Sequence, residues 1–401
     1  MTDTPHKFAI LLGDGMSDIT IPELGNKTPL EYAQTPAMDA IAQAGLVGRA
    51  KTVPNGMKPG SDVANMSLMG YDPRTYYSGR APIEAASMGV DLGPRDVAFR
   101  CNLVYLDKGV MADYASGHIE SDDAHALIED VQKELNAKSV RLVPGVSYRH
   151  LLIINDYPDG ELTCTPPHDI SGKAYSDYLP QGAGDHLLRE IFDKAQSVLN
   201  RSARNAQRTA QGKVPANAIW LWGQGKSVAY PSFRQRFGID GAVISAVDLV
   251  KGIGMLAGLA VCNVPGATGY LDTNYAGKVA AAVDAYRYGD FVYLHIEAPD
   301  ETSHEGSLEK KIQSIEDFDS KVVAEMVQLQ KQMPDLRLIV MPDHATLLST
   351  RTHDATPVPF AVCGPGICKD TVRVYNEQAA AHAPVFGGVD VCEQLITGTF
   401  G

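Results

Sequence analysis

The feature of this sequence that most constrains its fold is a series of short apolar runs, each ending in a loop rich in glycine, aspartate or histidine. These runs lie at residues 8–12, 218–221, 291–296, 336–341 and 360–362. Amphipathic stretches typical of helices lie between them, for example at 35–44, 277–287 and 307–330. Buried parallel strands have this continuous apolar pattern, and strands that alternate with helices indicate an α/β fold with a mostly parallel sheet.

The middle of the chain has a different pattern. Extended segments at residues 98–106 and 150–154 lie on either side of a helical segment at 122–136. A chain of 401 residues also exceeds the size at which a single hydrophobic core usually stops growing. We therefore predict a core domain formed by residues 1–95 and 209–401, with a smaller α+β domain inserted at 96–208.

Charge and cysteine content restrict the partners and the compartment. The formal net charge is −13, which argues against nucleic acid and anionic membrane as partners. The six cysteines have neither zinc-site nor redox-motif spacing, so we interpret them as reduced thiols in the cytoplasm. No segment approaches the about 20 apolar residues that span a membrane, and the N-terminus lacks a signal-peptide pattern. We expect a cytoplasmic protein that acts on a small metabolite.

Carboxylates and imidazoles follow several of the predicted strands, where ligands of parallel α/β sheets gather. The candidate metal ligands are Asp14, Asp300, His304, Asp343, His344 and His353. A single aspartate at such a position is usually a helix cap or turn residue, but a set of this size at separate strand ends favours metal binding. Mixed carboxylate and imidazole ligation suits Zn or Mn better than Mg. Two such ions can clamp the attacking and leaving oxygens of a phosphoryl transfer.

A serine at the start of a predicted helix is a candidate nucleophile. Ser61 lies in the segment PGSDVAN, directly before an apolar run. The pattern indicates a helix start with Ser61 as N-cap. A helix N-terminus also stabilises a bound phosphate or a developing alkoxide, so the structural and catalytic interpretations are compatible.

Several segments resemble the archaeal type of cofactor-independent phosphoglycerate mutase, which also occurs in bacteria. They are GDGM, GNKTPLEYAQTPAMDAIAQAG, KPGSDVANMSLMGYDP, YYSGRAPIEAAS, AFRCNLV and PDHATLLSTRTHDATPVPF. The resemblance extends from about residue 7 to 395. It implies an alkaline-phosphatase-like three-layer α/β/α core with an inserted domain that binds substrate and closes as a lid. It also implies the interconversion of 3-phosphoglycerate and 2-phosphoglycerate through a phosphoserine.

The resemblance implies a role for each matching residue. Ser61 carries the phosphoryl group, and it binds the first ion together with Asp14, Asp343 and His344. Asp300, His304 and His353 bind the second ion, and Lys251 steadies the phosphate. The implied cofactors are two divalent ions, Mn or Zn in preference to Mg, without 2,3-bisphosphoglycerate. Candidate substrate contacts from the inserted domain are Arg80, Arg100, His118, Arg149, His150 and His168. For each arginine, a surface ion pair is the alternative.

Other functions stay open at this point. The segments at residues 220–226 (WLWGQGK) and 251–254 (KGIG) also resemble bacterial relatives proposed as homoserine kinases. The chain contains neither a Walker A motif nor the protein-kinase motifs. A phosphatase that uses the same metals and a catalytically silent metabolite-binding protein are the remaining alternatives.

Overall fold

The computed structural model describes residues 6–400. The chain forms two compact units: the core unit extends to Tyr77 and resumes at Ala229, and the inserted unit is Ser78–Val228. The inserted unit is wider than the predicted 96–208 segment. The reason is that helix α5 (Arg80–Ser87) and strand β9 (Ala218–Lys226) both pack against β3 (Val97–Asp107) within this unit.

The core unit is built on a single eight-stranded sheet with the order β11-β10-β12-β1-β13-β16-β2-β17. The strands are, in that order, Ala260–Val261, Gly241–Ile244, Phe291–Ile296, Lys7–Gly13, Leu336–Met341, Val358–Cys363, Leu46–Lys51 and Val385–Gly387. The five strands from β11 to β13 are parallel, which confirms the expected mostly parallel sheet. The expectation for residues 360–362 was wrong in direction, because β16 runs antiparallel to both β13 and β2.

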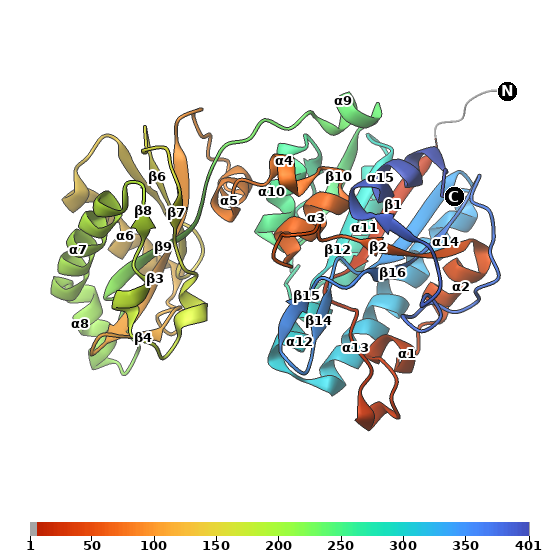
Figure 1. The fold of residues 1–401 in the computed structure, drawn as a ribbon, viewed down its shortest axis with the longest axis horizontal. Helices are drawn as coiled ribbons and strands as arrows, with labels where there is room; N and C mark the ends of the chain where they lie inside the picture. The colour runs from red at the N-terminus through yellow and green to blue at the C-terminus, as the bar shows by residue number, and fades with distance from the viewer. Residues whose placement is uncertain (1–5, 401) are drawn as a thin grey trace. The chain divides into compact units, whose positions relative to one another are not determined.

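Helices cover both faces of this sheet and give three layers (Figure 1). One face carries α2 (Pro36–Ala44), α11 (Tyr275–Ala285) and the continuous helical segment α13, η4 and α14 (Leu308–Phe318, Asp319–Val323 and Ala324–Gln332). The other face carries α3 (Ser61–Leu68), α10 (Asp248–Leu256) and α15 (Gly388–Thr397). The shorter core-unit helices are η1 (Pro22–Leu24), α1 (Pro29–Tyr32), α4 (Pro73–Tyr76), α9 (Phe233–Phe237) and α12 (Ala298–Glu305).

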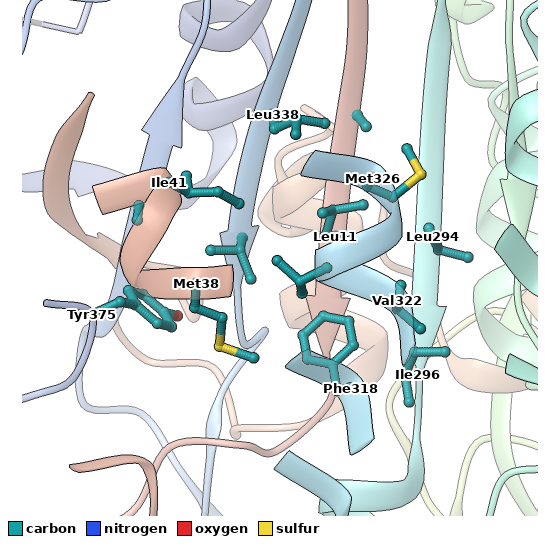
Figure 2. Close-up of a cluster of buried hydrophobic side chains, with 14 of the residues drawn as sticks. Leu11, Met38, Ile41, Leu294, Ile296, Phe318, Val322, Met326, Leu338 and Tyr375 are labelled. Carbon is teal, nitrogen blue, oxygen red and sulfur yellow. The ribbon is translucent and has the colours of Figure 1, made fainter. Parts of the chain in front are cut away.

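Alternate residues of the central strands point to the two faces, so both faces must be apolar. Leu11, Leu294 and Leu338 point to one side, where they pack against Phe318 and Met38 of the covering helices (Figure 2). All five side chains are completely buried. This burial on both sides explains why the strands appear in the sequence as unbroken apolar runs.

The carboxyl ends of three neighbouring strands meet at one edge of the sheet. Gly13 of β1 pairs with Ile296 of β12, and Leu12 pairs with Met341 of β13. The segments that follow these strands therefore begin side by side. They contain the candidate metal ligands. A short hairpin, β14 (Ala345–Leu347) and β15 (Thr352–Asp354), continues the segment after β13.

The inserted unit contains an antiparallel sheet in which β3 pairs with β4, β6 and β9, and β5 pairs with β6. The strands are β4 (Val110–Asp113), β5 (Val140–Val143) and β6 (Arg149–Ile154), with the separate pair β7 (Leu162–Thr163) and β8 (Gln181–Gly182). The helices are α6 (Ser121–Leu135), α7 (Asp185–Arg201), α8 (Ala203–Ala210), η2 (Pro167–Ile170) and η3 (Tyr175–Tyr178).

Residues 218–221 were expected to form a parallel strand of the core. They instead begin β9, which is antiparallel to β3 in the inserted unit. Helices α6 and α7 bury one face of β9, and a second apolar cluster buries its other face. A strand buried on both sides has the same apolar pattern in either kind of sheet. No helix within residues 6–400 is both long enough and apolar enough to cross a membrane.

Candidate metal centre

Three residues from two strand ends form a first ligand group, defined as Asp14, Asp343 and His344. One ligand atom from each lies within 4.8 Å of the others, and all three side chains are buried. His344 Nε2 is 3.5 Å from Asp14 Oδ1 and 3.4 Å from Asp343 Oδ2. The hydroxyl oxygen of Ser61 lies 3.1 Å from the same nitrogen. The four residues predicted for the first ion are thus brought together.

A second ligand group, defined as Asp300, His304 and His353, adjoins the first. Asp300 and His304 lie one turn apart on α12, and His304 Nε2 is 3.1 Å from Asp300 Oδ2. His353, on β15, places its Nε2 3.0 Å from His304 Nε2 and 3.5 Å from Asp300 Oδ1. His344 also lies within 4.8 Å of Asp300 and His353 through their ligand atoms, so this imidazole stands between the two groups.

Hydrogen bonds orient two of the imidazoles so that Nε2 faces the cluster. His304 Nδ1 lies 2.8 Å from the carbonyl oxygen of Arg351, which can only accept a hydrogen bond. His344 Nδ1 lies 3.2 Å from Thr346 Oγ1, and this hydroxyl donates to Asp300 Oδ1 at 2.5 Å. Each Nδ1 therefore carries a proton, so Nε2 is the nitrogen that each imidazole can offer to a metal ion.

The electrostatics of the two groups also suit a cation. Burial and the neighbouring carboxylates of Asp343 and Asp300 raise the pKa of Asp14 well above its ordinary value. Although burial alone would raise it, hydrogen bonds from His304 and His353 hold the pKa of Asp300 well below its ordinary value. Asp14 Oδ1 is buried without a hydrogen-bond partner among residues 6–400. A buried carboxylate oxygen beside further carboxylates and imidazoles is the donor set of a divalent transition-metal or zinc site.

Gly15 of the GDGM segment is required by close packing at this centre. Its φ of +59° lies in the left-handed region. A Cβ atom at this position would lie 2.5 Å from both Asp300 Oδ1 and Thr346 Oγ1. The Gly15 amide also donates to Asp343 Oδ1 at 3.1 Å. Only glycine allows the chain after β1 to approach the ligands this closely.

Ser61 is the first residue of α3. The expectation that it is the N-cap was wrong by one position, because the cap is Gly60, which has no side chain to bond the helix. The Ser61 hydroxyl is thereby left to face His344 at the positive end of the helix.

Lys251 lies on α10, which packs against α3. Its ammonium group is 3.5 Å from the carboxylate of Asp248, one turn earlier. Burial lowers the pKa of the nearby Lys278 to about 8, and the charge of Lys251 acts in the same direction.

Five of the six candidate substrate residues form two groups in the inserted unit, one around Glu84 and Trp222 and one around Tyr148. Arg80 and Arg100 each bond Glu84 through Nε, at 2.9 Å and 2.8 Å. Arg100 stacks over Trp222, with 4.2 Å from its guanidinium carbon to the ring centre, and the His168 ring lies 5.4 Å from the same indole. The remaining two surround a tyrosine: the ring of His118 and the guanidinium of Arg149 lie 5.7 Å and 5.6 Å from the ring of Tyr148.

His150, the sixth candidate, is buried within the inserted unit. It is 2% exposed, and its Nδ1 accepts a hydrogen bond from the Gly145 amide at 3.0 Å. Burial, with the nearby His125, lowers the pKa of His150 to about 3. The alternation of β6 turns this side chain into the unit, so it is an interior residue here.

Sequence reasoning assigned no role to four polar residues at this centre. Asn65, His295 and Thr346 hydrogen-bond to ligands, and Tyr293 hydrogen-bonds to Asn65. Asn65 Nδ2 donates to Asp343 Oδ2 at 2.8 Å, and His295 Nε2 lies 2.9 Å from Asp14 Oδ2. A signal was present for two of them. Tyr293 and His295 are two residues apart in the strand FVYLHI, so they share one face of an otherwise apolar strand.

Comparison with known proteins agrees with this geometry. The family model for 2,3-bisphosphoglycerate-independent phosphoglycerate mutase matches residues 42–205. A mutase of that name from Methanosarcina mazei is 52% identical over 378 residues, covering 94% of this chain and 95% of the relative.

Two solved structures are similar over nearly the whole length. A protein from Pyrococcus horikoshii has a TM-score of 0.81 at 28% identity, with 99% of each chain covered. The cofactor-independent phosphoglycerate mutase from Thermoplasma acidophilum has a TM-score of 0.66 at 25% identity, covering 98% of this chain and 99% of the other. The ligand residues at the strand ends and this similarity in sequence and structure lead to one conclusion. The chain belongs to the family of 2,3-bisphosphoglycerate-independent phosphoglycerate mutases.

Proposed function

We propose that this protein interconverts 3-phosphoglycerate and 2-phosphoglycerate, with Ser61 as the transient carrier of the phosphoryl group. The observation that carries the proposal is the position of the Ser61 hydroxyl, 3.1 Å from His344 Nε2. That imidazole belongs to the first ligand group and also adjoins the second. A nucleophile at such a junction is what a phosphoryl transfer assisted by two ions requires.

The residues present suit two divalent ions, and we assign Mn or Zn in preference to Mg. Asp14, Asp343, His344 and Ser61 would hold one ion. Asp300, His304 and His353 would hold the other. Bound there, the ions supply positive charge that lowers the pKa of a nearby hydroxyl and stabilises the oxygens of a transferring phosphoryl group.

The chain's own groups carry the transfer in two steps. The Ser61 oxygen attacks phosphorus, the bond between phosphorus and the 3-oxygen breaks, and that oxygen takes up the proton that Ser61 releases. The glycerate then presents its 2-hydroxyl to phosphoserine 61. The bond to Ser61 breaks as the 2-phosphate forms, and the hydroxyl proton returns to Ser61. No phosphate is lost to water, so the reaction is an isomerisation and not a hydrolysis.

Positive side chains are needed to neutralise and orient the substrate. We assign Lys251 to the phosphoryl oxygens, since α10 packs against the helix that begins at Ser61. We assign the substrate contacts of the inserted unit to the groups around Glu84 and Trp222 and around Tyr148, which contain Arg80, Arg100, His118, Arg149 and His168. Arginine suits the carboxylate of glycerate because its planar fork bonds both oxygens.

The proposed compartment is the cytoplasm. All six cysteines are free, and three of them are buried thiols. Free cysteines are typical of proteins kept in a reducing compartment.

An assay coupled to enolase tests the function. The Mn-loaded protein receives 3-phosphoglycerate without any 2,3-bisphosphoglycerate, and a second sample is treated with EDTA. We expect rapid formation of 2-phosphoglycerate that EDTA abolishes and Mn restores. Absence of turnover in the loaded protein would overturn the proposal. Release of free phosphate would then indicate a phosphatase, and consumption of ATP with homoserine would indicate a kinase.

A further inference from the structure

Strand β12 has two different faces. Leu294 and Ile296 point into the apolar core (Figure 2), whereas Tyr293 and His295 point to the opposite side. Both polar side chains are completely buried. Burying a phenol and an imidazole is unfavourable unless each is hydrogen-bonded, so their partners explain why they are present.

His295 forms a continuous chain of hydrogen bonds with Ser245 and Asp14. The Ser245 hydroxyl oxygen accepts from the Val247 amide at 2.9 Å and lies 3.1 Å from His295 Nδ1. On the other side, His295 Nε2 lies 2.9 Å from Asp14 Oδ2. A metal-binding aspartate is a carboxylate and only accepts, so Nε2 donates to it. Nδ1 then accepts the hydroxyl hydrogen of Ser245, so each contact in the chain has one donor and one acceptor.

Tyr293 forms a second chain that ends on the other carboxylate of the first ligand group. Its hydroxyl donates to Asn65 Oδ1 at 2.6 Å. The amide nitrogen of Asn65 uses both hydrogens, one to Asp343 Oδ2 and one to the Ser61 carbonyl, each at 2.8 Å. All the hydrogen-bonding capacity of the amide nitrogen is used, so Asn65 has a single orientation.

We propose that one face of β12 is a two-armed support for the first ligand group. His295, backed by Ser245, orients Asp14, and Tyr293 orients Asp343 through Asn65. These four residues are positioning residues, because they act through the carboxylates. This inference rests on the proposed function in that the first ligand group is taken to bind a divalent ion.

The support has a clear physical purpose. Asp14 and Asp343 are like charges in a buried site, and both side chains lie next to His344 Nε2. Without fixed donors, the two carboxylates would be free to rotate apart. The bond from His295 to Asp14 Oδ2 leaves Asp14 Oδ1 facing His344 Nε2. On Asp343, the same Oδ2 accepts from Asn65 and faces His344 Nε2, so that bond fixes the ligand oxygen directly. Partners of this kind, which bond ligands and not the ion, commonly change metal affinity by about 10–100-fold.

The test compares substitutions at His295 that differ only in their ability to donate. His295→Leu removes the donor, whereas His295→Gln places an amide N–H near the position of Nε2. Ile296→Val is the matched control, since it alters the next residue on the core-facing side of the same strand. Calorimetric titration with Mn²⁺ gives the affinity and the number of ions. The visible absorption of the Co²⁺-loaded protein reports ligand geometry without using activity.

We expect the wild type to bind two ions. In His295→Leu, the affinity for one of them should fall by about 10–100-fold, with altered Co²⁺ bands. His295→Gln should recover most of the affinity, and Ile296→Val should match the wild type. Two milder variants extend the test if His295→Leu does not fold: Tyr293→Phe and Ser245→Ala each remove one hydroxyl. Each should lower the affinity for the same ion by a smaller factor.

Unchanged affinity and unchanged Co²⁺ bands in His295→Leu and Tyr293→Phe would overturn the inference. Because the wild type would still bind two ions and turn over 3-phosphoglycerate, the proposed function would survive. Equal losses in His295→Leu, His295→Gln and Ile296→Val would also overturn it, since they would report general destabilisation. If the wild type bound no divalent ion, the proposed function would fail and the inference with it.

Discussion

Lys311 places its ammonium group 2.9 Å from the carboxylate of Asp18, and both side chains are almost completely buried. The ammonium also donates to the carbonyl oxygens of Thr346 at 2.7 Å and Ser17 at 3.3 Å. It therefore joins α13 to the segment that follows β1 and to the hairpin that follows β13. Both segments contain proposed metal ligands, so this buried ion pair connects stability of the core unit with the geometry of the site.

Lys311→Met should destabilise the protein strongly. The substitution removes the ammonium and leaves the Asp18 carboxylate buried and unpaired, which typically costs about 3–5 kcal/mol. Urea unfolding followed by circular dichroism measures the change. The double variant Lys311→Met with Asp18→Asn should recover part of the loss, because it no longer buries a charge.

The neighbouring lysine is the control for this prediction. Lys310 is about half exposed and pairs with Glu305 at 2.7 Å. An exposed ion pair contributes about 0–1 kcal/mol to stability, so Lys310→Met should leave the midpoint of urea unfolding nearly unchanged. Equal effects of the two lysine substitutions would contradict the importance assigned to the buried pair.

Gly15→Ala should disrupt the metal centre. Its added methyl group would lie 2.5 Å from Asp300 Oδ1 and Thr346 Oγ1, so these groups must move. We expect divalent-ion affinity to fall by at least about tenfold, measured by titration calorimetry.

Gly25→Ala separates this clash from backbone strain. Gly25 has a similar φ of +70°, but its Cβ would meet no atom within 4 Å. At both positions, alanine would have to adopt the left-handed backbone conformation, which costs about 1–2 kcal/mol. Only Gly15→Ala should lose metal affinity, and a comparable loss in Gly25→Ala would refute the packing explanation.

Ser61→Ala should abolish transfer while ion binding largely survives. The carboxylate and imidazole ligands remain, but no oxygen is present to accept the phosphoryl group. Mutase activity should drop by at least about a thousandfold, and mass spectrometry should find no phosphoserine after incubation with substrate. Full activity in this variant would disprove the covalent route.

Ser67→Ala is a matched control on the same helix. Ser67 is completely buried, and its hydroxyl has no hydrogen-bond partner among residues 6–400. Removing an unsatisfied buried hydroxyl should leave activity intact and should not lower the stability.

His150 should contribute to acid destabilisation. Its pKa in the folded protein is about 3, because burial and the neighbouring His125 disfavour the charged form, against an ordinary value of 6.5. Above pH 6.5 the residue is neutral in both states. As the pH falls below 6.5, the unfolded chain binds a proton that the folded chain does not, so stability is lost progressively down to about pH 3.

His150→Asn should make this loss shallower, because asparagine does not titrate and its oxygen can accept the Gly145 amide hydrogen. Urea unfolding at several values between pH 4 and pH 7 measures the slope, to which one proton contributes at most about 1.4 kcal/mol per pH unit. A slope unchanged by His150→Asn would contradict the assigned pKa.

The local sequence pattern was sufficient to predict many of the strands and helices of the core unit. The apolar run before Asp14 predicts a buried strand, and β1 forms there. The four-residue spacing of Asp300 and His304 predicts one helical face, and α12 places their side-chain atoms 3.1 Å apart. These predictions succeeded because period and spacing are properties of neighbouring residues.

The local sequence pattern could not predict the direction of a strand or the domain to which it belongs. Residues 218–221 and β16 are as apolar as the parallel strands, yet both run antiparallel, and β9 lies in the inserted unit. An apolar run encodes burial but not the identity of the strand beside it.

The sequence by itself determined which residue types are available for chemistry and that they follow strands. Only the tertiary structure decided that His344 stands between two ligand groups, that His150 is interior, and that Tyr293 and His295 support the carboxylates. The physical reason is that the side-chain contacts of the site join residues such as Asp14 and His295, which are hundreds of positions apart. Such contacts depend on sheet register and packing, which no local window of sequence contains.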